Sequence, residues 1–109
     1  MRPLENKKLL TLIAPVELQR LLIDTLKRRE IGGYTLVPCT GAGTTGLRSG
    51  MLGVDSNVLI YVIMSEHRLE RVLEDIDALM RGGYRVKAIV QDIAIMPRKI
   101  TARGMEGVE

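Results

Sequence analysis

The chain has 109 residues, which is the length of one domain, and 46% of them are hydrophobic while only 3% are aromatic. It contains no Phe or Trp, so Leu, Ile, Val and Met must form the core, and a surface that stacks nucleic-acid bases is disfavoured. A net charge of +3 is too small for nucleic-acid binding through many phosphate contacts, although it suits small anionic ligands.

The single cysteine excludes a disulfide within the chain, which favours a reducing, cytoplasmic location. We expect no signal peptide, because residues 1–8 are polar, and no membrane span, because every apolar run is short.

The first half of the chain predicts two strands separated by a helix. The apolar run Lys8–Ala14 is typical of a strand, and Pro15 suits the first position of a helix because its missing N–H is not needed there. We expect the helix to end at Gly32–Gly33, and the second strand to cover Tyr34–Val37 and to break at Pro38. One face of the helix carries leucines at helical spacing: Leu18, Leu21, Leu22 and Leu26.

The second half repeats this pattern. Val58–Met64 is an uninterrupted apolar run, and Ser65 is a favourable N-cap for the helix that follows. We expect this helix to end at Gly82–Gly83, and Tyr84–Met96 to form the fourth strand before a flexible C-terminal tail at residues 97–109. The apolar stripe of the helix is expected to contain Leu69, Val72, Leu73, Ile76 and Met80.

The order β-α-β-β-α-β predicts an α+β, ferredoxin-like fold for a single domain, residues 1–109, with a four-stranded antiparallel sheet and two helices on one face. Val58–Met64 does not alternate between polar and apolar residues, as a strand with one wet face should. We therefore expect further copies of the chain to cover the other face. Ile60→Lys or Val62→Lys should then disrupt the assembly if that residue faces the partner.

A loop rich in glycine and threonine, at about residues 40–56, connects the second and third strands. Glycine lets backbone N–H groups turn toward an anion, and Arg48 adds a forked charge that matches phosphate or carboxylate oxygens. Composition leaves two interpretations open, an anion-binding or nucleotide-binding loop and a flexible connection. Because five glycines fall between residues 41 and 53, we expect the loop to be ordered only when a ligand is bound.

The residue content offers little support for catalysis or for a metal site. His67, in the first turn of a helix, is interpreted as a solvated surface residue, and Cys39 as a small apolar residue at a strand end. A nucleophile needs a base beside it, and a metal ion needs several ligands, which one His and one Cys do not provide. The acidic residues of the second helix are interpreted as a solvated outer face: Glu66, Glu70, Glu74, Asp75 and Asp77.

Three short segments resemble the PII superfamily, namely Gly33-Tyr34-Thr35, Gly41-Ala42-Gly43-Thr44 and Arg48-Ser49. The chain most resembles the PII-like branch linked to bicarbonate, which includes SbtB-type and carboxysome-associated proteins, and residues 40–56 correspond to the T-loop of that family. The resemblance implies a homotrimer with its sheets packed at the centre. It also implies adenine nucleotides, ADP or AMP, in the clefts between subunits.

The resemblance also implies which residues bind these ligands. The phosphates would be held by Thr40, Gly41, Gly43, Thr44 and Arg48, and bicarbonate by Arg48 and Ser49. The turn after the second helix corresponds to the B-loop of the family, where nucleotide contacts would come from Arg81, Gly82, Gly83 and Tyr84, with Arg85 as a further source of charge. The alternative for these glycines is an ordinary helix end. Arg98, Lys99 and Arg103 would reach a neighbouring cleft, unless they belong to a disordered tail.

The loop lacks the tyrosine that is modified in nitrogen-regulatory PII proteins, and the Lys- and Asp-containing motif of their B-loop is absent around Gly82–Gly83. The resemblance thus implies a non-enzymatic sensor of ADP or AMP and bicarbonate that regulates inorganic-carbon uptake or fixation. Its partner would be a bicarbonate transporter or a carboxysome-related protein, with no nucleic acid. The alternatives are an RRM-like RNA-binding domain, in which Tyr61 would be the stacking residue of the third strand, and a small enzyme or metal-tolerance trimer of similar fold.

Overall fold

A computed structural model describes residues 1–41 and 55–98. These residues form β1 (Glu5–Pro15), α1 (Gln19–Arg28), β2 (Thr35–Gly41), β3 (Asp55–Met64), α2 (Glu66–Arg81) and β4 (Lys87–Ile95), with a 3-10 turn at Val16–Leu18 before α1. The predicted order of elements is confirmed. Pro15 is the last residue of β1 and the N-cap of the 3-10 turn, and α1 itself begins only at Gln19. The predicted flexibility of the loop and the tail concerns mainly residues 42–54 and 99–109, which lie outside the described residues.

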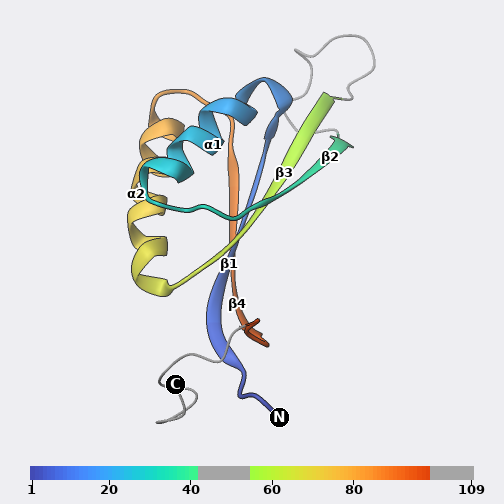
Figure 1. Ribbon diagram of the computed structural model, residues 1–109. Coiled ribbons are helices and arrows are strands. Elements are labelled where there is room, and N and C mark those ends of the chain that lie inside the picture. Colours follow the sequence, from blue (N-terminus) through green and yellow to red (C-terminus); the bar gives the residue numbers. More distant parts are fainter. Residues whose placement is uncertain (42–54, 99–109) are drawn as a thin grey trace.

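The sheet has the strand order β2-β3-β1-β4, and each neighbouring pair is antiparallel. Figure 1 shows α1 and α2 packed together on one side of this sheet. This arrangement confirms the α+β, ferredoxin-like fold. The core lies between the sheet and the helices and is formed by Leu10, Leu12, Ala14, Leu22, Leu26, Ile31, Val58, Ile60, Val62, Met64, Leu69, Val72 and Ile76.

Residues of β3 alternate between the two faces of the sheet. Ile60 and Val62 lie under the helices with 0% and 1% of their surface exposed, whereas Ile63 points to the other face and is 50% exposed. The condition of the prediction, that Ile60 or Val62 faces a partner, is therefore not met, because the period of a strand places both in the core of the subunit.

The face of the sheet opposite the helices also carries apolar residues from all four strands. The registers of the sheet place Leu9, Ile13, Val37, Leu59, Tyr61, Ile63, Ile89 and Ile93 on this open face. Apolar side chains from adjacent strands thus form one continuous surface, which is unusual for a monomer in water.

The helix α1 ends at Arg28, earlier than predicted. The N–H of Ile31 donates to the carbonyl of Leu26 at 3.1 Å, and Glu30 adopts a positive φ of 63°. These are the bond and the left-handed residue of a Schellman motif. The prediction that Gly32–Gly33 end the helix is wrong, because the buried side chain of Ile31 fixes the motif at an earlier position.

The left-handed conformation of Glu30 leads to a prediction about stability. Glu30→Gly should raise the free energy of unfolding by about 0.5–1 kcal/mol, since a Cβ is unfavourable there and part of the gain is offset by the greater freedom of glycine in the unfolded chain. Glu30→Ala is the matched control, because it removes the carboxylate but keeps the Cβ. The measurement is urea denaturation of wild type and both variants. An equal increase in the free energy of unfolding for Glu30→Gly and Glu30→Ala would contradict the explanation by backbone conformation.

The helix α2 begins as predicted but presents a slightly different apolar face. The side chain of Ser65 accepts a hydrogen bond from the N–H of Arg68 at 3.2 Å, which confirms the predicted N-cap. Met80 is 39% exposed, and Leu79 packs against the core. The assignment of Met80 to the apolar stripe is therefore wrong.

The limits of the edge strands also differ from the prediction. The strand β2 continues through Pro38 to Gly41 and does not break at Pro38. Since β2 is an edge strand, a proline that lacks an N–H can be accommodated there. The strand β4 begins at Lys87 and not at Tyr84, because Tyr84 still belongs to the turn that closes α2.

Candidate functional site

The end of β2 contains the described part of the predicted phosphate-binding loop. Thr40 and Gly41 pair with Ser56 and Asp55 of β3, so the strand holds the base of the loop in place. A Cβ at Gly41 would lie 3.3 Å from the side-chain nitrogen of Asn57, which leaves little room for a larger residue. The other predicted residues of the loop, Gly43, Thr44, Arg48 and Ser49, lie outside the described residues.

The turn after α2 contains four further predicted site residues. The N–H of Tyr84 donates to the carbonyl of Leu79 at 3.1 Å, and Gly83 has a φ of +99°, so the two residues complete a Schellman motif. This turn accounts for the need for glycine at Gly83. Gly82 has an ordinary φ of −80°, so the conformation of the turn does not require glycine there.

Two side chains of this turn are accessible from solvent. Tyr84 is 46% exposed. Arg81 pairs with Asp77 at 3.3 Å, but the two side chains are 74% and 63% exposed, so the guanidinium remains available to a ligand. An exposed pair of this kind contributes little to stability.

The order of the strands separates these two groups within one subunit. One row across the sheet contains Val37, Leu59, Ile13 and Lys87. Because β2 ends and β4 begins near this row, the loop after β2 and the turn before β4 lie at the same end of the sheet. However, β2 and β4 are opposite edges, roughly 14 Å apart at the usual strand spacing of about 4.8 Å. One chain therefore does not bring the two groups together.

Arg98 lies at the other end of the molecule. It follows the end of β4, which pairs with the start of β1 through Ile95 and Glu5. The guanidinium of Arg2 donates to the carbonyl of Arg98 at 2.8 Å. Within one subunit Arg98 is thus remote from the turn at 81–84. Lys99 and Arg103 lie outside the described residues.

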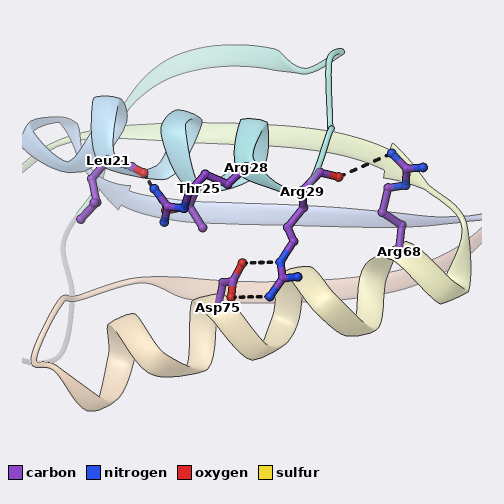
Figure 2. A network of polar contacts seen from close by, with 6 residues as sticks. All are labelled: Leu21, Thr25, Arg28, Arg29, Arg68 and Asp75. Atoms are coloured by element: carbon purple, nitrogen blue, oxygen red, sulfur yellow. Dashed lines mark hydrogen bonds and ion pairs between the residues drawn. The ribbon is translucent and has the colours of Figure 1, made fainter.

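A polar network joins the end of α1 to α2 (Figure 2). Both Nε and Nη2 of Arg29 donate to the carboxylate of Asp75, at 2.8 and 3.0 Å. These bonds hold the pKa of the Asp75 carboxyl below its usual value, because they favour its charged form. The assignment of Asp75 to a solvated outer face is therefore wrong. Asp75 faces α1, and its partner is 46 residues away in the sequence.

The pair of Arg29 and Asp75 leads to a prediction about pH. Asp75→Asn should lower the free energy of unfolding at pH 7 by about 0.5–1 kcal/mol, since both side chains are partly exposed. The folded-state pKa is depressed, so this stabilisation is present above the unfolded-state pKa of about 3.9 and is lost as the pH falls through the folded-state pKa.

Urea denaturation at several pH values tests this prediction, with Asp77→Asn as the control for an exposed carboxylate. The difference between wild type and Asp75→Asn should shrink below about pH 4. A difference of the same size at pH 3 and pH 7 would argue against the assignment of the pair.

Two other residues considered for chemistry lie far apart. Cys39 is a half-buried residue of β2, and His67 is an exposed residue in the first turn of α2. Among the described residues, His, Cys, Asp and Glu form no group that could hold a metal ion. No helix in the described ranges is long and apolar enough to cross a membrane.

The fold, the loop after β2 and the turn after α2 define a class of small ferredoxin-like proteins in which one face of the sheet is uncovered in the single chain. A comparison with protein families shows which family this class corresponds to. A model of the family described as nitrogen regulatory protein P-II matches residues 7–98. The chain belongs to the P-II family.

Solved structures agree with this assignment. The structure of CPII from Thiomonas intermedia, bound to ADP and bicarbonate, is 25% identical with a TM-score of 0.74, over 87% of this chain and 93% of that chain. A PII-like signalling protein from Thermus thermophilus is 29% identical with a TM-score of 0.69, over 85% of this chain and 92% of the other. A search of curated proteins gives no match.

Proposed function

We propose that this protein is a non-enzymatic signalling trimer that binds ADP or AMP together with bicarbonate in clefts between its subunits. The observation that carries the proposal is the similarity in fold and sequence to CPII, whose structure contains ADP and bicarbonate. The match to the P-II family supports a regulatory protein in general.

The open face of the sheet supports the trimer. Apolar residues such as Leu59, Ile63 and Ile89 need cover, and packing three sheets around one axis would supply it. The same assembly would bring the β2 edge of one subunit toward the β4 edge of the next. The loop base at Thr40–Gly41 and the turn at Arg81–Tyr84, which are separated within one chain, would then face one cleft.

In this proposal the phosphates lie against loop residues, and the turn after α2 contacts the rest of the nucleotide. The proposed phosphate ligands are Thr40, Gly41, Gly43, Thr44 and Arg48. Bicarbonate binds beside Arg48 and Ser49, since a small planar anion needs several converging donors. The proposal also includes nucleotide contacts from five further residues: Arg81, Gly82, Gly83, Tyr84 and Arg98.

Calorimetric titration with ADP over a series of bicarbonate concentrations tests this function. If the two ligands share Arg48 and loop N–H groups, each should raise the affinity of the other by the same factor. ATP should compete with the pair, because bicarbonate would occupy about the space of a third phosphate. An ADP affinity that does not change across the bicarbonate series would refute the coupling, and no binding of any adenine nucleotide would refute the function itself.

The proposed role is regulation of inorganic-carbon uptake or fixation, through contact of residues 40–56 with a bicarbonate transporter or a carboxysome-related protein. RNA binding is the weaker alternative. Among the described strands, Tyr61 is the aromatic residue on the open face, whereas an RRM stacks two or three bases on several aromatic residues. A short RNA titrated under the same conditions should show no saturable binding.

A further inference from the structure

The helical side of the protein contains a basic groove that the proposed function does not use. It is a hollow of about 240 Å³ between the end of α1 and the first turns of α2, and we call it the arginine groove. Its lining residues are Arg28, Arg29, Glu30, His67, Arg68 and Arg71.

The arginine groove is remote from the proposed nucleotide residues at the end of β2 and in the turn after α2. The turn at 81–84 follows the last turn of α2, whereas His67 lies in the first, and at about 1.5 Å per residue the two are roughly 20 Å apart. Figure 1 shows the start of α2 at the end of the sheet opposite the end of β2. A ligand in the groove would therefore not occupy the cleft proposed above.

Positive charge is in excess in the groove. Four arginines line it. The nearby carboxylates are Glu30, in the lining, Asp75, bound to Arg29, and Glu74, which also acts on the charge of Arg29, so the net charge is 4 − 3 = +1. Guanidinium groups confined to such a small volume repel one another unless an anion compensates them.

Two of the arginines are held in place by the protein itself (Figure 2). Asp75 binds Arg29 through two hydrogen bonds, and Nη1 of Arg68 donates to the carbonyl oxygens of Arg29 and Glu30 at 3.5 and 3.0 Å. Since these carbonyls close the end of α1, Arg68 ties the two helices together. These contacts give Arg29 and Arg68 a structural role and hold the floor of the groove in a fixed geometry.

The other basic side chains of the groove have no comparable role in the fold. Arg28 makes one long hydrogen bond to the hydroxyl of Thr25, at 3.3 Å. Within the described part of the chain, Arg71 and His67 make no hydrogen bond or ion pair through their side chains. Both side chains are exposed beside the fixed floor.

The composition and the size of the groove indicate the chemistry of a ligand. Its four arginines carry planar forked donors that match the oxygens of a phosphate group. The volume is below the range of roughly 300–1,000 Å³ that is usual for pockets enclosing a whole small molecule. We propose that the arginine groove is a second anion site that binds a phosphate group through Arg71, Arg28 and His67.

The experiment is a titration of the full-length, ¹⁵N-labelled protein with inorganic phosphate, compared with sodium chloride at equal ionic strength. Phosphate should shift the amide signals of residues 28–30 and 66–71 in a saturable way. The double variant Arg28→Gln/Arg71→Gln should bind phosphate at least about tenfold more weakly, because each lost charge-assisted bond is a large part of the affinity for so small an anion. Arg20→Gln, which removes an exposed arginine near the start of α1, is the matched control and should bind like wild type.

Several results would overturn the proposal of a phosphate site in the arginine groove. Equal shifts with chloride, or unchanged affinity in the double variant, would overturn the proposal. So would saturation of the groove by a glutamate-rich peptide that phosphate does not displace, since the ligand would then be a carboxylate partner.

A parallel titration with glycerol phosphate distinguishes the source of the phosphate. Tighter binding than inorganic phosphate supports a phosphorylated metabolite, and equal binding supports the free anion. The amide signals of residues 28–30 and 66–71 are separate from those of residues 81–84, so this test of the groove does not depend on nucleotide binding.

Discussion

Ile63→Lys is expected to convert the proposed trimer into folded monomers. Ile63 points away from the helices and is 50% exposed in a single subunit, so a lysine there does not disturb the core. In the assembly the same position would lie between sheets, where a buried charge without a partner costs several kcal/mol. Light scattering at micromolar concentration should give about one third of the wild-type mass, with an unchanged circular dichroism spectrum.

Ile60→Lys is the matched control on the same strand. Ile60 is 0% exposed and packs under the helices, so the lysine should unfold the subunit, whether or not it is assembled. Opposite outcomes for positions 60 and 63 would confirm that one face of β3 forms the core and the other the interface. A wild-type protein that is monomeric, or an Ile63→Lys variant that keeps the wild-type mass, would overturn assembly through the open face.

The strands and helices could be predicted because their signals are periodic and local. Val58–Met64 is apolar at every position, and this pattern correctly indicated that both faces of the strand carry apolar side chains. It did not tell which residues face which way, because only the register fixes the two faces. For this reason the sequence could offer Ile60 or Val62 as an interface residue only on the condition that it faces the partner.

The ends of the elements depended on tertiary contacts that the sequence does not display. Gly32–Gly33 looked like the end of α1, but burial of Ile31 placed the left-handed residue at Glu30. Gly82–Gly83 ended α2 as predicted, because Gly83 itself takes the positive φ. The same pair of glycines thus has different roles in the two halves of the chain.

The candidate site was predictable only in part. The loop residues were proposed from a short motif and the turn at 81–84 from its position after the second helix, and both assignments stay predictions. The network of Arg29, Arg68 and Asp75 joins residues that lie far apart in sequence and depends on how α1 packs on α2. A pattern of exposed charges along one helix carries no signal for such a contact.

Arg48→Ala is expected to weaken nucleotide or bicarbonate binding by roughly ten- to a hundredfold. Arg48 is the only cation between Thr40 and Asn57 in the sequence, so no other residue of the loop can replace its charge. A hydrogen bond from a guanidinium to a phosphate is charge-assisted and contributes on the order of 1.5–3 kcal/mol, which corresponds to that change in affinity. Arg48→Lys should restore only part of the loss, since an ammonium group cannot bind two oxygens in a fixed fork.

The measurement is calorimetric titration of wild type and both Arg48 variants with ADP, with and without bicarbonate. Size-exclusion chromatography and thermal unfolding serve as controls and should be unchanged, because an arginine in a sequence rich in glycine and threonine is not expected to belong to a hydrophobic core. Arg20→Ala, which removes an exposed arginine on α1, should bind ADP like wild type. If Arg48→Ala keeps its affinity while Arg20→Ala does as well, Arg48 is a solubilising charge in a glycine-rich connection, and the nucleotide must be bound elsewhere.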